Sequence, residues 1–336
     1  MKLASFRAAD RDRIGVVLEG GELLDLSETL RACGVPEDRV PRTMLELIES
    51  ESVTLEVVRE AVGRVGAIAS TAAIPIAANP AALRRFSPTD VTWHPPVRRP
   101  SKICCLALNN SANSDRILRG PKHPAMFTKP ASALVGHGGA IECKPQYGRT
   151  HPEPELAVVI GKTAKSIRAA DAYDYVFGYT IHNDITSPTM RGEDTFQYRA
   201  IHPKGDDPGQ IEYVDTWVSY PGRYKCADTF ACMGPWLVTK DEIPDPHALG
   251  VRCLHKDRLV TQDTTANLTH KVPEVLAFLS DYLTLWPGDI ISMGTALAKS
   301  SGGGAIQNID LNRLGGPVSV VIERIGTLSN HVLQVT

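Results

Sequence analysis

The 336-residue sequence has no excess of charge of one sign, since 36 Lys and Arg residues are balanced by 38 Asp and Glu residues. A basic excess is typical of chains that bind nucleic acid or anionic membranes, so neither activity is expected. No apolar run approaches the ~20 residues that a membrane-spanning helix needs. Residues 1–7 are not followed by the apolar core of an export signal, and the expected location is therefore the cytoplasm.

The sequence also lacks paired cysteines and nucleotide-binding glycines. Its seven cysteines form no C-x-x-C pair and are odd in number, which favours reduced, mostly buried thiols. No G-x-G-x-x-G segment follows a strand and precedes a helix, so nothing supports nicotinamide or nucleotide binding. The apolar content of 43% is nevertheless sufficient for compact cores. These features favour a cytoplasmic enzyme.

The chain divides at a proline cluster. Before it, short apolar runs on either side of Gly20-Gly21 predict a hairpin, and Thr43 begins a helical pattern. Four prolines then fall within residues 87–100, where they predict a stiff connector. We therefore expect a small N-terminal hairpin and helix domain over 1–95 and a catalytic domain over 96–336.

The second part of the chain is rich in predicted strands. They are expected over residues 103–108, 156–160, 176–181, 236–239, 251–255, 259–262 and 318–322. One clear helix surrounds Pro273, and no regular alternation of strand and helix is present. The pattern predicts a β-rich α+β fold.

Two glutamates stand directly before a long apolar run at residues 156–160. In a strand, residues i and i+2 face the same way, so Glu153 and Glu155 would project together. Two adjacent carboxylates repel each other, and the pKa of one rises unless a cation lies between them. The alternative is an exposed polar strand start, where paired glutamates are common.

A third carboxylate follows the apolar strand predicted over 176–181. Asp184 would emerge at the end of that strand, where functional groups usually lie. Three convergent carboxylates make an all-oxygen site, which favours Mg²⁺, Mn²⁺ or Ca²⁺ over Zn²⁺. The formal charge of three carboxylates and one dication is −1, so an anionic substrate needs additional cations. The candidates are Lys225, Arg191 and Lys129.

The segment E-P-E-L-A-V-V-I-G-K at 153–162 resembles the core motif of the fumarylacetoacetate hydrolase superfamily. Five further blocks agree with that superfamily in order: F-T-K-P at 127–130, G-Y-T-I-H-N-D at 178–184, K-C-A-D-T-F at 225–230 with M-G-P-W-L-V-T at 233–239, L-W-P-G-D-I-I-S-M-G-T at 285–295, and I-G-T-L-S-N at 325–330. Each block alone is weak evidence for the superfamily, but the occurrence of all of them in the same order is specific to it. The resemblance spans roughly residues 100–336.

This resemblance implies a catalytic domain with a mixed β-sandwich and roll, usually in a homodimer. It implies that Glu153, Glu155 and Asp184 hold Mg²⁺ or Mn²⁺, and that the substrate is a small 2-oxo or β-diketo carboxylic acid. The metal would act as a Lewis acid toward an enolate. Lys225 matches a lysine near the developing oxyanion, and Thr295 matches a position that binds the substrate carboxylate. The alternatives are a solvated lysine and an ordinary turn threonine.

The sequence departs from the superfamily pattern at a lid motif, N-Y-x-x-H-x-x-E, in which a His–Glu pair activates water. Asn113 stands where the histidine is expected and Arg116 where the glutamate is expected, and neither can act as a base. Asn113 is therefore predicted only to contact substrate. A displaced histidine is a candidate substitute base, either His151 or one of His123, His137 and His182, although a hydrogen-bonded structural histidine is the alternative in each case.

A second departure follows Asp184. Residues 186–194 are more similar to the corresponding stretch of the superfamily's 2-keto-3-deoxy sugar-acid dehydratases. Arg191 is predicted to bind a substrate carboxylate and Glu193 to serve as acid or base, unless both belong to an ordinary polar loop. An insertion at 202–224 is expected to be either a dimer arm or an extra wall of the pocket.

The sequence thus leaves three functions open. The first is hydrolysis of a C–C bond in a 2-oxo or β-diketo acid, the commonest activity that the resemblance implies. The second is a lyase in the same site (dehydratase, hydratase or decarboxylase), which the missing lid base favours because no water has to be activated. The third is an inactive binding protein on the same fold.

Overall fold

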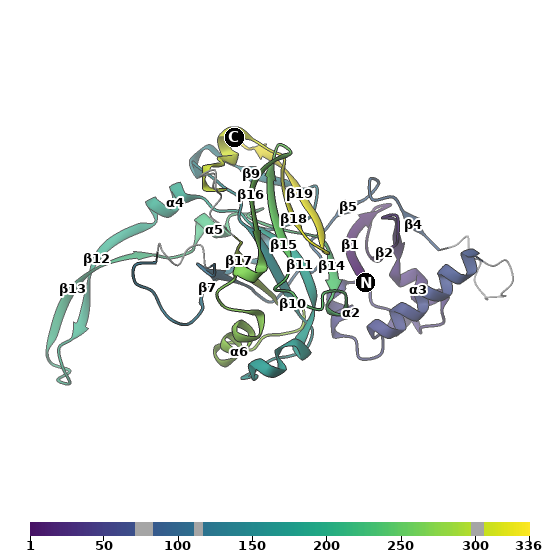
Figure 1. Cartoon of the computed structure of the whole chain (residues 1–336), viewed down its shortest axis with the longest axis horizontal. Coiled ribbons are helices and arrows are strands. Elements are labelled where there is room, and N and C mark those ends of the chain that lie inside the picture. Colours follow the sequence, from purple (N-terminus) through teal and green to yellow (C-terminus); the bar gives the residue numbers. More distant parts are fainter. Residues whose placement is uncertain (71–82, 111–116, 297–305) are drawn as a thin grey trace.

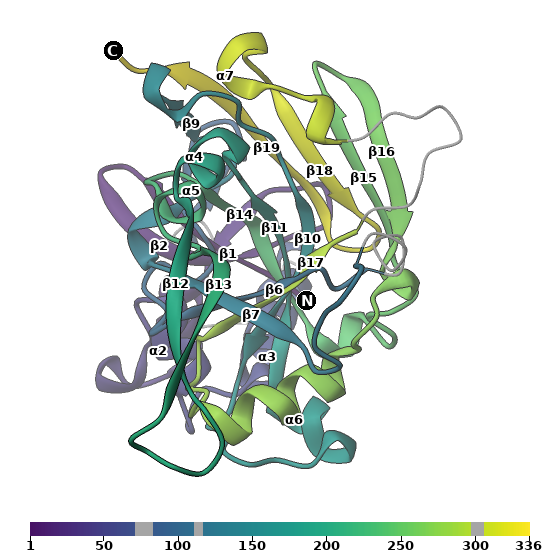
Figure 2. The ribbon, with the colours of Figure 1, turned by 90° about the vertical axis from the view of Figure 1, so that its left-hand side faces the viewer.

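The computed structural model describes residues 1–70, 83–110, 117–296 and 306–336. Most of its strands lie in two sheets (Figure 1, Figure 2). The larger sheet has the spatial order β4 (Arg85–Phe86), β3 (Leu23–Asp25), β2 (Arg11–Val17), β1 (Lys2–Ala8), β14 (Ala231–Thr239), β11 (Val176–Asp184), β10 (Pro154–Ile160), β17 (Ile290–Thr295), β6 (Ile103–Ala107) and β7 (Ala125–Lys129), with β5 (Thr92–Trp93) beside β1 and β8 (Leu134–Val135) beside β14. The smaller sheet has the order β16 (Arg258–Thr264), β15 (Gly250–His255), β18 (Val318–Ile322), β19 (Gly326–Gln334) and β9 (Ala140–Cys143).

Strand β10 is buried on both of its faces. Leu156, Val158 and Ile160 belong to an apolar cluster that extends to the smaller sheet. Ala157 and Val159, on the opposite face, belong to a second cluster that includes the N-terminal strands and helices. An uninterrupted apolar run is what a strand covered on both faces requires. The second cluster includes residues of the helices α1 (Leu26–Ala32), α2 (Met44–Glu49) and α3 (Leu55–Ser70). The first cluster includes residues of α6 (Val272–Tyr282) and of the shorter helices α4 (Pro188–Glu193), α5 (Arg223–Cys226) and α7 (Leu311–Leu314).

The β-rich α+β fold expected from the sequence is confirmed, with several strands longer than predicted. Strand β11 continues to Asp184 because its backbone remains paired with both β10 and β14 beyond residue 181. Strand β14 begins at Ala231 rather than at residue 236, since residues 231–234 pair with the end of β11. The sequence pattern misses these ends because polar residues form the end of β11, whereas Gly234-Pro235 interrupt the apolar run of β14.

The N-terminal strands are part of the larger sheet, because Lys2 and Leu3 of β1 pair with Val238 and Leu237 of β14. The helix predicted from Thr43 is present as α2, with the Thr43 side chain accepting a hydrogen bond from the Glu46 amide at 3.2 Å. The division at residue 95 remains a prediction. Among the described residues, no helix combines the length and the apolar character that crossing a membrane requires.

A buried carboxylate fixes the start of strand β17. Asp289 is fully buried and accepts hydrogen bonds from the amides of Trp286 and Lys102, at 2.7 and 3.1 Å, and from the Ser101 hydroxyl at 2.6 Å. The ammonium group of Lys102 lies 2.5 Å from the same carboxylate. Replacing Asp289 with Asn puts an amide group among these donors and removes the charge. The free energy of unfolding is expected to fall by about 2–3 kcal/mol in urea titrations.

The matched control is Asp281→Asn, because Asp281 is an exposed residue of helix α6 whose side chain has no hydrogen-bond partner among the described residues. Its free energy of unfolding should stay within about 0.5 kcal/mol of the wild type. Equal stability of the two variants would contradict the role given to Asp289.

Candidate metal centre

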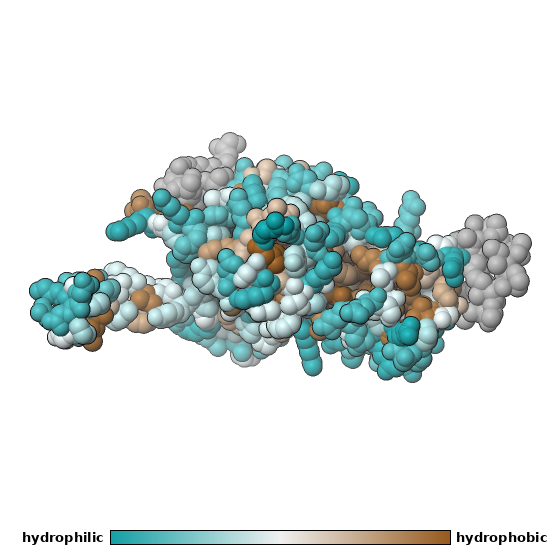
Figure 3. All heavy atoms as spheres, turned by 90° about the horizontal axis from the view of Figure 1, so that it is seen from below, coloured by the Kyte–Doolittle hydropathy of each residue, from teal (hydrophilic) through white to brown (hydrophobic). Residues whose placement is uncertain are grey.

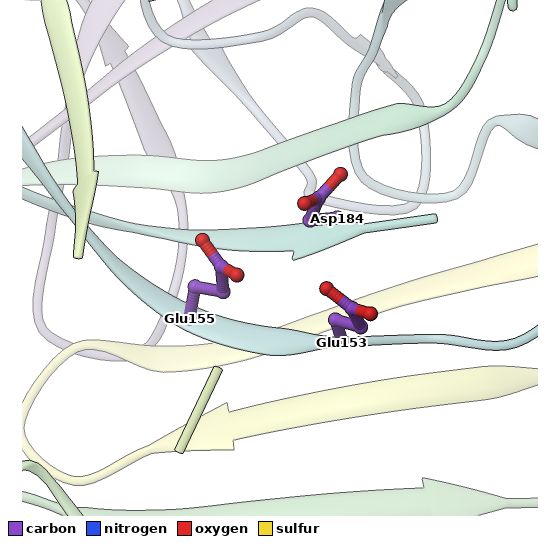
Figure 4. A group of neighbouring side chains, drawn as sticks. All are labelled: Glu153, Glu155 and Asp184. Atoms are coloured by element: carbon purple, nitrogen blue, oxygen red, sulfur yellow. The ribbon is translucent and has the colours of Figure 1, made fainter. Parts of the chain in front are cut away.

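Three carboxylates meet where the first residues of β10 lie beside the last residues of β11. The two strands are antiparallel, and Pro154 pairs with Asn183, so Glu153 lies opposite Asp184. Glu155 lies two residues further along β10 on the same face. Glu153, Glu155 and Asp184 each present an oxygen, and these oxygens lie within 4.8 Å of one another (Figure 4). The structure thus brings together the three residues that the sequence predicts as metal ligands.

Two lysines contact these carboxylates. The Lys225 ammonium, on α5 (Arg223–Cys226), donates to Glu153 Oε2 at 2.8 Å and to Asp184 Oδ2 at 2.5 Å. Lys129 Nζ, at the end of β7, lies 2.5 Å from Asp184 Oδ1 and donates to the carbonyl of Lys225. Both lysines are buried. The formal charge of the five side chains is therefore −1.

The charges of this cluster hold one another in the ionised state. Burial raises the pKa of Asp184, but the ammonium groups of Lys129 and Lys225 outweigh it, and the pKa lies below its usual value. Burial likewise raises the pKa of Glu153, and Lys225 and His151 bring it well below the usual range. Burial lowers the pKa of Lys225, but the negative charges of Asp184 and the two glutamates have the larger effect. The pKa of Lys225 therefore lies above its ordinary value. At neutral pH, Glu153 and Asp184 are therefore anionic and Lys225 is cationic.

His151 and Thr295 complete the contacts of the glutamates. His151 Nε2 lies 3.1 Å from Glu153 Oε1, while its Nδ1 has no hydrogen-bond partner within the described part of the chain. The Thr295 hydroxyl, at the end of β17, is 3.1 Å from Glu153 Oε2 and 3.2 Å from Glu155 Oε1. Both predicted residues thus touch the carboxylates.

Sequence reasoning missed Ser292, which orients Glu155. Its hydroxyl donates to Glu155 Oε2, and His182 Nδ1 lies 2.7 Å from the same hydroxyl. All three residues are buried. A serine within the apolar run Ile290–Met293 is the signal that could have identified it, because a buried hydroxyl needs a partner.

A cavity of about 810 Å³ opens beside the carboxylates. Its wall contains His151, Glu153, Lys225 and Thr295 together with apolar residues such as Phe127. The Lys225 ammonium lies 5.1 Å from the centre of the Phe127 ring. The volume is typical of sites for small molecules.

Two arginines also line this cavity, Arg191 on α4 (Pro188–Glu193) and Arg119. Both are exposed, and neither has an acidic partner among residues 1–70, 83–110, 117–296 and 306–336. Unpaired guanidinium groups at a cavity can bind carboxylates bidentately. The cavity thus combines an acidic cluster, partly neutralised by lysines, with two guanidinium groups that have no acidic partner in the described part of the chain.

One further predicted site residue, Glu193, is not brought to the cavity. Glu193 is exposed, does not line the cavity, and forms an ion pair of 2.6 Å with Arg223. The structure therefore does not support the predicted acid–base role of Glu193, because Arg223 holds its carboxylate at the surface. Asn113 lies outside the described residues, as does Arg116.

The fold has a counterpart among known proteins. The family model described as fumarylacetoacetate (FAA) hydrolase C-terminal matches residues 102–333, which include all three carboxylates and both lysines. The match covers more than half of the chain. The chain therefore belongs to the fumarylacetoacetate hydrolase family, as the motifs predicted, and this family consists of enzymes.

The similar curated proteins carry a more particular name. The mitochondrial oxaloacetate tautomerase Fahd2a of Rattus norvegicus is 30% identical over 99% of this chain and 92% of its own length. The mitochondrial oxaloacetate tautomerase FAHD2B of Bos taurus is 31% identical over the same shares.

Among solved structures, maleylpyruvate hydrolase from Sphingobium sp. SYK-6 aligns over the full length of both chains with 27% identity and a TM-score of 0.67. The same enzyme in complex with manganese(II) and pyruvate gives 26% identity and a TM-score of 0.67, again over both full chains.

Proposed function

We propose that this protein is a divalent-metal-dependent tautomerase that interconverts the keto and enol forms of a 2-oxo dicarboxylic acid of the oxaloacetate type. The observation that carries the proposal is the cluster of three carboxylates and two lysines beside a cavity lined by two arginines that pair with no described acidic residue. The names of the relatives at 30–31% identity support the choice of reaction.

The donor set fits a hard dication. The possible ligand atoms of Glu153, Glu155 and Asp184 are all oxygens. Mg²⁺, Mn²⁺ and Ca²⁺ prefer oxygen ligands. The manganese complex of the similar maleylpyruvate hydrolase supports the same class of ion. When bound, the ion would supply Lewis-acid stabilisation of negative charge on the substrate's oxo group.

The lysines provide fixed positive charge for the same oxygen. Lys225 is held by two carboxylates and lines the cavity, so its ammonium group can donate a hydrogen bond to an enolate oxygen as charge develops. Lys129 supports this arrangement, since it pairs with Asp184 and donates to the Lys225 backbone. Thr295 offers a hydroxyl to the substrate carboxylate beside the oxo group.

Tautomerisation also requires a group that moves one proton. In the direction from keto to enol, the carbon next to the oxo group loses a proton and the oxo oxygen gains one. We assign both transfers to His151, which takes the proton from carbon and returns it to the oxo oxygen, because it is the one histidine that lines the cavity among the described residues. No water has to attack the substrate, so the reaction does not need the missing lid pair.

Arg191 and Arg119 are proposed to bind the distal carboxylate of the substrate. The Arg191→Leu variant is expected to raise KM for oxaloacetate about 10–100-fold, the value of one to two lost charge-assisted hydrogen bonds. Deuterium exchange into pyruvate, which lacks the second carboxylate, should change little. Steady-state kinetics on both compounds measures the difference.

The matched control is Arg252→Leu, because Arg252 is exposed on β15 and does not line the cavity. Its KM for oxaloacetate should equal the wild-type value. An Arg191→Leu variant with unchanged KM for oxaloacetate would remove the distal subsite from the proposal.

C–C bond hydrolysis is the second candidate. The similarity to maleylpyruvate hydrolase favours it, whereas the replacement of the lid histidine and glutamate by Asn113 and Arg116 disfavours it. The lyase reactions use the same enolate chemistry and differ only in the bond that breaks.

The deciding experiment supplies oxaloacetate, an acylpyruvate and a 2-keto-3-deoxy sugar acid to the purified protein with Mg²⁺ or Mn²⁺, followed by NMR in D₂O. Faster loss of the oxaloacetate enol with deuterium at C3, abolished by EDTA, is the expected result. Formation of pyruvate and a second acid would instead indicate hydrolysis. Release of CO₂ would indicate decarboxylation, and loss of water alone would indicate dehydration. The cytoplasmic location stays a prediction.

A further inference from the structure

A second cavity, of about 350 Å³, lies in the N-terminal part of the chain, and we call it the arginine cavity. Its wall is formed by residues of β1, β2 and α2 and by the segment that follows β5. These elements lie around the N-terminus, to the right in Figure 1. The arginine cavity shares no lining residue with the cavity beside the three carboxylates. The charged side chains in its wall are Asp12, Arg13, Arg42, Arg98 and Arg99.

The wall of the arginine cavity is positively charged, although the whole chain has a net charge of −2. Four arginines and one aspartate give the wall a formal charge of +3. The aspartate, Asp12, is already shared, because Arg7 lies 2.9 Å and Arg98 2.5 Å from its carboxylate. His94 Nε2 also lies 2.9 Å from Asp12. Three groups thus compete for the one anionic side chain of the wall.

Arg13 is the buried member of this group, with 7% of its side chain exposed. Its Nη1 lies 2.5 Å from Asp25 and 3.3 Å from Glu28, and its Nε donates to the carbonyl of Ala8 at 3.3 Å. Its Nη2 is buried and has no hydrogen-bond partner among residues 1–70, 83–110, 117–296 and 306–336. A buried N–H group needs an acceptor, and an anion in the cavity that Arg13 lines would supply one.

Two exposed arginines of the wall are free to turn toward such an anion. Arg99 has no acidic partner in the described part of the chain. Arg42 lies 3.3 Å from Glu37, but Arg31 holds the same carboxylate at 2.5 Å. Glu46 accepts a hydrogen bond from the backbone amide of Arg42 rather than from its guanidinium group. Exposed ion pairs contribute little free energy, so Arg42 loses little when it exchanges Glu37 for a ligand.

The remainder of the wall suits the carbon skeleton of a small molecule. Ile14, Met44, Leu45 and Pro96 line the arginine cavity beside the arginines. The surface of the N-terminal part, to the right in Figure 3, presents apolar patches between hydrophilic side chains. A volume of about 350 Å³ is within the range of small-molecule sites. Nucleic acids and membranes instead bind along extended basic surfaces.

We propose that the arginine cavity is a second ligand site, which binds a small organic anion with two or more negative charges carried by phosphate or carboxylate groups. Guanidinium groups bind both kinds of anion through paired N–H donors. Arg13 Nη2 donates to one anionic group of the ligand, and Arg42, Arg98 and Arg99 bind the others. This site is separate from the metal centre and does not rest on the proposed function.

The test is isothermal titration of the full-length protein with pyrophosphate and with citrate at constant ionic strength, and with acetate as the monovalent comparison. No metal is added, because both multivalent probes chelate dications. The wild type is expected to bind at least one of the two with a Kd below ~100 µM, and acetate at least ~10-fold more weakly. Tighter binding of pyrophosphate assigns a phosphate ligand to the site, and tighter binding of citrate assigns a polycarboxylate.

The double variant Arg42→Gln, Arg99→Gln is expected to bind the preferred probe at least ~10-fold more weakly, because it removes two charge-assisted donors. Both residues are exposed, so the circular dichroism spectrum should match that of the wild type. Arg13→Lys keeps a positive charge beside Asp25 but removes Nη2, and the same loss of affinity is expected.

Two variants serve as controls. Arg252→Gln removes an exposed arginine that lines neither cavity, and Arg191→Leu removes an arginine of the cavity beside the carboxylates. Both should bind the preferred probe as the wild type does. The proposal is overturned if neither probe binds the wild type, or if the double variant or Arg13→Lys keeps the wild-type affinity. A loss in Arg191→Leu as large as that in the double variant would also overturn it, since the anion would then lie in the other cavity. None of these measurements uses turnover, so their failure leaves the proposed reaction untouched.

Discussion

The Asp184→Asn variant is expected to bind Mg²⁺ or Mn²⁺ at least ~100-fold more weakly than the wild type and to lose measurable activity. The substitution keeps the shape of the side chain and raises the formal charge of the five-residue cluster from −1 to 0. A unit charge about 4 Å away contributes roughly 4 kcal/mol per elementary charge at the effective dielectric of a protein surface. Loss of ~3 kcal/mol already corresponds to about 100-fold in affinity.

Isothermal titration with MnCl₂ measures the affinity. Asp241→Asn is the control, because Asp241 is a partly exposed aspartate whose carboxylate pairs with Arg59 away from the cavity. Its manganese affinity should equal that of the wild type. If the Asp184 variant binds Mn²⁺ as tightly as the wild type, the three carboxylates are not the metal site and the proposed function loses its basis.

The Lys225→Met variant is expected to lose about 10²–10³-fold in kcat, the usual effect of removing one donor to a developing oxyanion. The affinity for the metal ion should rise in the same variant. The Lys225 ammonium lies 2.8 Å from Glu153 and 2.5 Å from Asp184, so its positive charge opposes a dication that shares these carboxylates. Removal of that charge should therefore tighten Mn²⁺ binding while turnover falls.

This split separates a role in turnover from a role in structure, because a merely misfolded site would lose both properties. Lys162→Met is the control, since Lys162 is an exposed lysine beyond the other end of strand β10. Both kcat and manganese affinity should be unchanged in that variant. A Lys225→Met enzyme with wild-type kcat would exclude Lys225 from the catalytic machinery.

The metal centre was the part of the site most accessible from the sequence. Glu153 and Glu155 are two positions apart beside a strand that must be buried, and a strand fixes which way such residues face. Asp184 ends a second apolar strand, and the family resemblance carried by the motifs implies that the two strands are neighbours. For these residues, local periodicity and resemblance to a family lead to the same arrangement.

Other features depend on contacts that no local pattern records. Ser292 reaches Glu155 only because β17 lies beside β10 in the sheet. Glu193 sits in a motif-like stretch, but Arg223, thirty residues later, holds it at the surface. The insertion at 202–224, expected to be a dimer arm or a wall of the pocket, belongs to a ribbon of β12 (Thr195–Pro203) and β13 (Ile211–Ser219), which begins earlier than residue 202 because Thr195 pairs with Ser219. Pairing partners distant in sequence decide each of these cases.

The pairing of β1 with β14 has a practical consequence for truncated forms of the protein. The family match begins at residue 102, which makes a shortened chain of residues 96–336 an attractive choice for expression. Loss of β1 would uncover the backbone of β14 at Leu237 and Val238 and strip the apolar layer from Ala157 and Val159. An open strand edge next to bared apolar surface is a template for aggregation. We expect the short form to precipitate although it retains every proposed metal ligand.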